Sequence, residues 1–313
     1  MKQILLLTLL ALGYQSASAQ LVTESFGSGA NQFTMDFVTI GNPGNAADTT
    51  GSPNPVGSVA YTYNLGKYEV SREQIDKANA AGSLGITVYD MSLYAGNGAN
   101  RPAQGISWNE AARFVNYLNT SKGYQTAYLF DGSGNFQLWS SVRASSNNFF
   151  RHKDAYYFLP SMDEWYKAAY GNLDGTWNNY PTGSDSAPTA VASGTAANTA
   201  VYYGQTSTAD ITNAGGLSPY GTMAQGGNVW EWNESALDGI NDTAGEVREL
   251  RGGSWSDWES VYLSAWYRGN NGPMNEDINN GFRVASVPEP STGLLVLLGL
   301  SGLLLKRRKT GTL

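Results

Sequence analysis

One stretch near the middle of the chain repeats its apolar residues with the spacing of a helix. The apolar positions are Ala111, Phe114, Val115 and Leu118. Their i, i+3, i+4, i+7 spacing places them on one face of an α-helix. Ser107 and Glu110 form a capping-box pattern ahead of this stretch, and Gly123 follows its end. The pattern therefore predicts a helix with one buried face.

Two further segments open with the same serine pattern. They are Ser71 with Gln74, at the start of a helix over residues 74–81, and Ser161 with Glu164, ahead of Trp165, Ala168 and Ala169. In such a box the serine and the Gln or Glu side chains each satisfy a backbone N–H at the helix start. Gly171 is expected to stop the third helix.

Strand signals are shorter and weaker. Phe33, Met35 and Phe37 alternate with polar residues, as on a strand with one buried face. The other β candidates are residues 156–159, 246–251 and 281–285. Two Gly-, Ser-, Asn- and Thr-rich stretches, 41–58 and 182–216, are predicted to be loops inside one domain. These patterns predict an α+β fold that is rich in loops.

Composition narrows the class of protein. The chain has 313 residues, of which 41% are hydrophobic and 14% are charged, well below the roughly 25% charge of an average soluble domain. Nine tryptophans, 19 tyrosines and 37 glycines are present. This composition excludes a coiled coil, a charge-rich disordered chain and a polytopic membrane protein, and no repeat with a period of 20–50 residues is visible.

Two scarce residue types exclude several chemistries. The sequence has no cysteine and a single histidine, His152. Disulfides, thiolate metal sites and cysteine nucleophiles are therefore excluded, as is any site that needs two or three histidines of one chain. No Ser-His-Asp set, P-loop or dinucleotide fingerprint is present. We expect His152 on the surface or in a loop, without a ligand role.

Residues 1–19 have the pattern of a secretory signal peptide. Lys2 precedes an apolar run over residues 4–12, and Ala17-Ser18-Ala19 is a small-x-small cleavage site. Signal peptidase is thus an expected partner, and the mature chain would begin near Gln20. The alternative is a buried N-terminal helix.

Residues 287–313 have a different character. The triplet Pro288-Glu289-Pro290 precedes an apolar stretch over 293–305, and a basic cluster that includes Arg307 and Arg308 follows. Thirteen residues of helix span roughly 20 Å, short of a bilayer core of about 30 Å. This order resembles the PEP-CTERM sorting signal of Gram-negative envelope proteins. The resemblance implies recognition by an exosortase, transient anchoring in the inner membrane, cleavage near the triplet, and an envelope or extracellular location. The alternative is a permanent C-terminal anchor.

The segment between these two ends is acidic. Residues 20–287 carry 14 Lys and Arg against 25 Asp and Glu, because five basic residues and one acidic residue fall in the ends, which leaves a net charge of −11. There is no basic patch in the sequence, so nucleic acid is not an expected partner.

Six short motifs occur in order between the two ends. They are 66–71 (GKYEVS), 105–111 (GISWNEA), 158–165 (FLPSMDEW), 227–232 (GNVWEW), 251–255 (RGGSW) and 281–284 (GFRV). Together they resemble the formylglycine-generating enzyme, or sulfatase-modifying factor, family. The resemblance implies a variant of the C-type lectin fold with little regular secondary structure, in a domain over residues 20–286 with its core at about 33–285.

The chain departs from that family at the catalytic positions. The family's oxidases bind copper through two cysteines that correspond here to positions near Asp257 and Tyr262. Neither residue offers a soft thiolate for Cu(I). A related branch, the ergothioneine-type sulfoxide synthases, uses an iron site with three histidines, which His152 alone cannot supply. We therefore expect neither copper nor iron, and we expect Arg251 and Arg283 to be buried ion-pair partners of acids such as Glu231.

Two functional hypotheses follow. The first is an exported, non-catalytic module that binds a polysaccharide or envelope protein, or acts in an extracellular matrix. Its candidate ligand surface consists of Trp255, Asp257, Trp258, Tyr262, Trp266 and Tyr267. The alternative role of these aromatic residues is core packing. The second hypothesis is an enzyme with an unspecified cysteine-free mechanism, for which Asp257 and Glu259 are candidate acid–base carboxylates.

The family resemblance also implies two structural Ca²⁺ sites. The implied ligands are Asn198, Thr199, Asp210 and Thr212 for the first site, and Gly227, Val229 and Glu231 for the second. Such mixed carbonyl, amide and carboxylate oxygens are typical of Ca²⁺. At the position of the second site's fourth ligand this chain has Ala224, without a side-chain oxygen. We expect a firm first site and a weak or empty second one; the alternative is that Glu231 pairs with an arginine.

Overall fold

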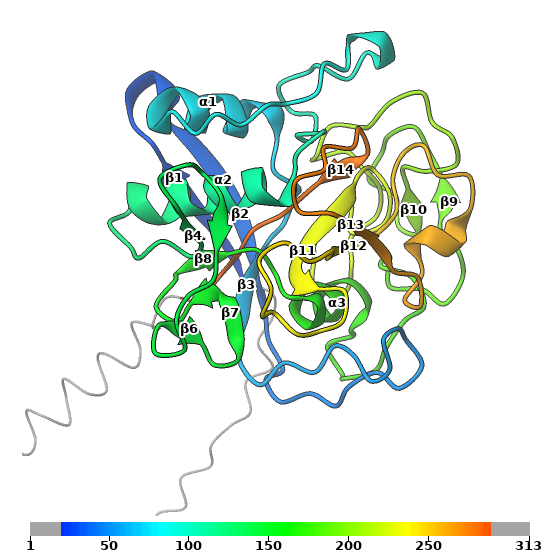
Figure 1. The fold of residues 1–313 in the computed structure, drawn as a ribbon. Coiled ribbons are helices and arrows are strands. Elements are labelled where there is room, and N and C mark those ends of the chain that lie inside the picture. Colours follow the sequence, from blue (N-terminus) through cyan, green and yellow to red (C-terminus); the bar gives the residue numbers. More distant parts are fainter. Residues whose placement is uncertain (1–19, 289–313) are drawn as a thin grey trace, which may run out of the picture.

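The computed structural model describes residues 20–288 (Figure 1). The predicted signal peptide at 1–19 lies outside the described residues. So do Glu289, Pro290, Arg307 and Arg308 of the predicted sorting signal; Pro288 is the last residue described. Within residues 20–288, no helix has the length and the apolar character needed to cross a membrane.

All three predicted helices are confirmed. They are α1 (Arg72–Gly82), α2 (Trp108–Ser121) and α3 (Met162–Tyr170). Each begins with the predicted capping box, in which the serine side chain accepts from the backbone of the third helical residue and the Gln or Glu side chain accepts from the serine N–H. Gly171 follows α3 directly, as predicted. The local sequence is therefore enough to set the residue at which each of these helices begins.

A five-stranded antiparallel sheet joins the two ends of the domain. Its strands, in spatial order, are β1 (Leu21–Phe26), β2 (Phe33–Ile40), β3 (Tyr63–Gly66), β15 (Ala285–Ser286) and β8 (Tyr157–Phe158). The predicted alternating strand at Phe33–Phe37 is the start of β2, where Phe33, Met35 and Phe37 are buried. β15 is the last strand among residues 20–288, and it lies between strands from the first and middle parts of the chain. The sheet therefore joins the C-terminal end of the domain to its beginning.

A four-stranded sheet carries the C-terminal half. Its order is β13 (Gly269–Asn271), β12 (Arg248–Arg251), β11 (Trp230–Ala236) and β14 (Asn280–Gly281). Only the β11–β14 pairing in it is parallel. The smaller elements are the strand pairs β4 (Leu129–Phe130) with β5 (Phe136–Gln137), β6 (Ala144–Ser145) with β7 (Asn148–His152) and β9 (Thr189–Ala190) with β10 (Thr199–Ala200), and the 3-10 helices η1 (Gly29–Asn31), η2 (Ser92–Tyr94) and η3 (Ser260–Leu263).

The strand predicted over residues 281–285 is wrong as a single element. The chain ends β14 at Gly281, leaves one sheet, and enters the other at Ala285. Between them, Phe282 and Val284 are buried in the core, while the Arg283 side chain reaches Glu231. The loop predicted over 182–216 also contains the short parallel pair β9–β10.

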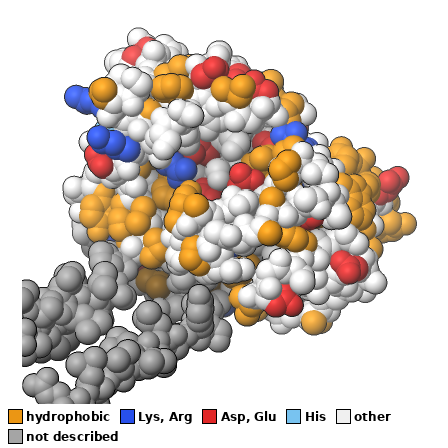
Figure 2. All heavy atoms as spheres, turned by 90° about the horizontal axis from the view of Figure 1, so that it is seen from below, with side chains coloured by type: hydrophobic (Ala, Val, Ile, Leu, Met, Phe, Trp, Pro, Cys, Tyr) orange, Lys and Arg blue, Asp and Glu red, His pale blue; other side chains and the backbone are white. Residues whose placement is uncertain are grey.

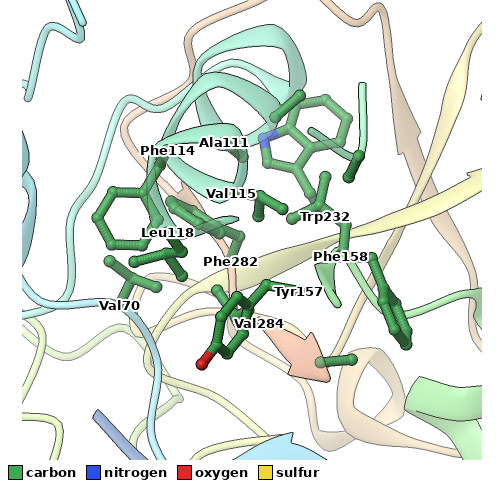
Figure 3. Packing of buried hydrophobic residues seen from close by; sticks show 14 of the residues in the cluster. Val70, Ala111, Phe114, Val115, Leu118, Tyr157, Phe158, Trp232, Phe282 and Val284 are labelled. Atoms are coloured by element: carbon green, nitrogen blue, oxygen red, sulfur yellow. The ribbon is translucent and has the colours of Figure 1, made fainter. Parts of the chain in front are cut away.

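The main core lies between α2 and the two sheets. Figure 3 shows Phe114, Val115 and Leu118 of α2 directed toward Phe282, with Trp232 of β11 beside them. All the predicted face positions of α2 are fully buried. The Trp232 indole N–H donates to the Ile106 carbonyl at 2.7 Å, so this large ring is buried without an unpaired donor.

His152 contradicts its predicted surface position. It ends β7 with 7% of its surface exposed, and its ring packs edge-on against Trp139 with 4.7 Å between centroids. Its Nδ1 accepts a hydrogen bond from the Asp154 backbone N–H at 3.1 Å. Burial, aided by the nearby positive charges of Arg143 and Lys153, lowers the pKa of His152. The imidazole is thus a neutral packing residue.

This burial predicts a pH dependence of stability. Below a pH of about 6.5 the unfolded chain binds a proton that buried His152 resists, so this residue lowers the free energy of unfolding as the pH falls. His152→Phe keeps the ring and removes the titration. Urea unfolding at pH 7.5 and pH 5 should show a smaller acid loss for His152→Phe than for the wild type. Equal losses in the two proteins would contradict the assignment.

Candidate functional site

The centre of the C-terminal half is a buried ion pair between Glu231 of β11 and Arg283. Both side chains are fully buried. The Arg283 Nε and Nη2 donate to the two Glu231 oxygens at 2.6 and 2.5 Å. The Trp165 indole N–H donates to Glu231 Oε2 at 2.6 Å, and the guanidinium also donates to the carbonyls of Gly66 and Met223. The expected ion pair of Glu231 with an arginine is therefore present.

A second buried carboxylate is shared by two arginines. Arg251 donates from Nε to Glu249 Oε1 at 2.6 Å, and Arg268 donates from Nη2 to Oε2 at 2.8 Å. Arg251 also donates to the carbonyls of Ala265 and Tyr267. The expectation of a buried ion pair for Arg251 is confirmed, with Glu249 as its partner.

The carboxylate expected in the second calcium site, that of Glu231, is engaged elsewhere. Both Glu231 oxygens accept from Arg283, and Ala224 adds no side-chain oxygen. A buried carboxylate that is neutralised by a bidentate guanidinium has little charge to offer a cation. These residues fit the ion pair and do not fit Ca²⁺.

The first set of expected calcium ligands is divided between separate neighbours. Asn198 Oδ1 accepts from the Thr182 hydroxyl at 2.7 Å. The Asp210 carboxylate, half-exposed, lies 3.3 Å from Arg101 Nε. Among residues 20–288, no group of three or more His, Asp or Glu side chains is placed to hold a metal. One oxygen of Asp210, Oδ1, thus already faces a cationic side chain.

The candidate ligand surface is part core and part surface. Trp258 and Trp266 have 67% and 46% of their surface exposed. Trp255 has only 6% exposed and packs against Tyr94, with 5.4 Å between ring centroids. It belongs to a core cluster that also contains Met91. Trp255 is therefore a core residue and not part of the candidate surface, while the other two indoles face solvent.

Trp258 is held in place although it is exposed. Its indole lies so close to Gly204 that a Cβ there would be 2.6 Å from the ring, and Gly204 has a φ of +63°. The Tyr203 ring meets it edge-on at 5.9 Å. Glycine is required here for both the backbone conformation and the close approach. Trp258 is thus a positioned surface aromatic.

The two positions that correspond to the family's cysteines provide hard donors. Asp257 accepts from the Ser254 N–H at 2.7 Å and from its hydroxyl at 2.9 Å, and burial raises the pKa of Asp257. Tyr262 packs against Tyr267 and Trp230. A carboxyl and a phenol do not fit the soft Cu(I) ion that two thiolates hold. Asp257 is half-buried, while Glu259 is exposed, so only the latter is a fully solvated charge.

A polar pocket beside these residues was missed by the sequence analysis. It has a volume of about 320 Å³, and all four strands of the β11 sheet contribute to its lining. Its lining includes Trp230, Tyr267, Arg268, Asp277, Asn279 and Asn280. In the sequence, the Asn and Asp residues of 275–280 look like turn formers. The only feature that could have indicated a site is how many of them occur in so short a segment.

Fold and motifs together define a C-type lectin-like domain of the formylglycine-generating enzyme type. The model of the sulfatase-modifying factor enzyme 1-like domain matches residues 29–287, and the chain belongs to this family. The PEP-CTERM protein-sorting motif matches residues 286–309. Comparison with curated proteins gave no match.

Three solved structures share the fold. Treponema denticola variable protein 1 is 22% identical, with 85% of this chain and 99% of that chain covered and a TM-score of 0.59. CarF is 20% identical, with 82% and 99% covered and a TM-score of 0.59. PvdO from Pseudomonas aeruginosa is 17% identical, with 85% and 98% covered and a TM-score of 0.54. At these identities the likeness concerns the fold alone.

The Glu231–Arg283 pair gives a prediction on stability. Glu231→Gln keeps the shape but leaves the guanidinium buried without its counter-charge, which should cost about 3–5 kcal/mol of unfolding free energy. The control is Glu73→Gln, which removes an exposed pair with Lys77 at 2.7 Å and should cost less than about 0.5 kcal/mol. Chemical unfolding measures both. Similar losses for the two variants would contradict the central role of the buried pair.

Proposed function

We propose that this chain is an exported binding module that contacts a polysaccharide or an envelope protein through an aromatic surface around Trp258 and Trp266. The observation that carries the proposal is the exposure of these two indoles on a domain with an otherwise well-filled aromatic core. Exposed, positioned rings are costly to hold in water and are a common feature of contact surfaces. The C–H face of a sugar ring packs well on such a ring.

The residues at the positions of the family's cysteines favour binding over catalysis. The chain lacks the thiolates with which its family activates oxygen, and Asp257 and Tyr262 at those positions are hard donors. Trp258 and Trp266 lie close in sequence to these same positions. A non-catalytic role, in recognition or in an extracellular matrix, therefore uses the residues that this chain has.

The PEP-CTERM motif marks the chain for exosortase-mediated sorting to the cell envelope. We further propose that signal peptidase removes residues 1–19 and that the C-terminal apolar stretch anchors the chain only until cleavage. The face in Figure 2 carries its basic side chains in small groups, while hydrophobic side chains gather at its left and right edges with polar ones between them.

Glycan binding tests the proposal directly. Residues 20–287 should bind one or more polysaccharides or oligosaccharides on a glycan array. Trp258→Ala combined with Trp266→Ala should weaken that binding about tenfold, because each lost ring contact is worth about 0.5–1.5 kcal/mol. The matched control is Val142→Ala, which removes a side chain with 74% of its surface exposed elsewhere. Undiminished binding by the double variant would refute the surface, and a flat array would favour a structural matrix role.

We also propose one Ca²⁺ site, on Asn198, Thr199, Asp210 and Thr212, in which the ion replaces Arg101 at the Asp210 carboxylate. Binding to the folded state alone raises the melting temperature by mass action. Millimolar Ca²⁺ should raise it by a few degrees over chelator for the wild type and for the helix-surface control Asp76→Ala, and not for Asp210→Ala. An unchanged melting temperature of the wild type in chelator would refute the site.

A further inference from the structure

We propose that the polar pocket on the β11 sheet holds one neutral sugar residue. This inference rests on the proposed binding function and names the class of ligand and its principal subsite. The pocket's volume of about 320 Å³ lies at the lower end of the roughly 300–1,000 Å³ of small-molecule sites. It is built on strands and not on loops alone, so its walls are held in place by backbone pairing.

One wall of the pocket is aromatic. The Trp230 indole lies against Gly269 of β13, where an added Cβ would be 3.0 Å from the ring. Tyr267 is 5.8 Å from Trp230 between ring centroids. The missing side chain at Gly269 thus leaves room for the indole across the strand. This wall offers a flat, apolar face to the C–H groups of a pyranose.

Polar residues next to this wall carry buried atoms without partners. Asn280 has 3% of its surface exposed, and its Nδ2 has no hydrogen-bond partner among residues 20–288. Asn279 Oδ1 and Arg268 Nε, which are also buried atoms of lining residues, lack partners in the same way. These atoms have almost no exposed surface, so they reach an occupant only when their side chains turn toward the pocket. Because buried polar groups are nearly always paired in folded proteins, a polar occupant would supply the bonds that they lack. Two donors and one acceptor suit sugar hydroxyls, since each hydroxyl can both donate and accept.

The charges of the pocket favour a neutral ligand. The Arg268 guanidinium is already paired with Glu249 through Nη2. The exposed Asp277 accepts from the Asn279 backbone N–H with Oδ1 at 2.9 Å, which leaves Oδ2 for a hydroxyl donor. An Asp carboxylate at the rim and no unpaired positive charge would repel a uronic acid, sulfate or phosphate group. A neutral hexose or N-acetylhexosamine satisfies the pocket best.

The pocket continues into the aromatic surface through Tyr262. Its ring is 6.2 Å from Trp230, and it is one of the predicted surface residues, on η3 close after Trp258 in the chain. A polysaccharide would therefore place one residue in the pocket at Trp230 and make further contacts along exposed rings. This arrangement explains how a domain with a small pocket can bind a long chain.

Simple glycosides test the pocket apart from the rest of the surface. Saturation-transfer NMR and tryptophan fluorescence titration of residues 20–287 would use the methyl glycosides of glucose, galactose, mannose and N-acetylglucosamine, with methyl glucuronide as the anionic comparison. At least one neutral glycoside should bind. Asn279→Ala and Asp277→Asn should each weaken it about three- to tenfold, the size of one or two lost hydrogen bonds. Neither change removes a side-chain hydrogen bond that the fold uses, because Asn279 Oδ1 is unpaired and the amide that replaces the Asp277 carboxylate keeps an Oδ1 acceptor.

The matched controls are Asn147→Ala and Asp76→Asn, two exposed residues outside the pocket lining, which should bind as the wild type does. A glycan array that is positive and depends on Trp258 and Trp266, together with no binding of any neutral glycoside, would overturn the pocket and leave the proposed function intact. A flat array with no glycoside binding would overturn both. Tighter binding of the glucuronide, or pocket variants that bind like the controls, would also overturn the inference.

Discussion

The buried pair of Glu231 and Arg283 holds the C-terminal half of this domain together. Five parts of the chain meet at its two side chains: β11, the link between the two sheets, α3 through the Trp165 indole, β3 through a carbonyl, and the loop at Met223. Two buried charges are tolerated only when every donor and acceptor around them is matched. Each of these segments is therefore placed by the same constraint, although they are far apart in sequence.

Elsewhere in the domain, buried polar side chains form hydrogen bonds with backbone groups that long helices and strands would pair in other folds. Asn228 accepts from the Ala209 N–H and donates to Glu69, whose pKa is raised well above its ordinary value by burial and then by the nearby Glu231. Asn119 similarly bonds both backbone groups of Tyr157. Such side chains mimic a paired strand where no strand is available. A loop-rich domain can thus be rigid enough to present a defined surface.

The sequence predicted what depends on near neighbours. Capping boxes and the alternation in β2 act within a few residues, so the three helices and that strand were found. The break between β14 and β15 was not, because Arg283 turns toward a carboxylate 52 residues away. The burial of His152 was misjudged, and Trp255 was left open between ligand surface and core. Both depend on contacts with rings from other parts of the chain, which the local sequence does not show. For the site, Trp258 and Trp266 were candidates from the sequence. Asn279 and Asn280 can be recognised as site residues only in the folded structure, where β14 pairs with β11 beside Trp230.

The place of β15 in its sheet also bears on the order of events in export. This strand, Ala285–Ser286, sits between β3 and β8, yet it is the last paired segment before the sorting motif matched from residue 286. A partly synthesised chain lacks this strand, so its pairings with β3 and β8 cannot form until the end of the domain has been made. Scission after Ser286 would leave the completed sheet whole.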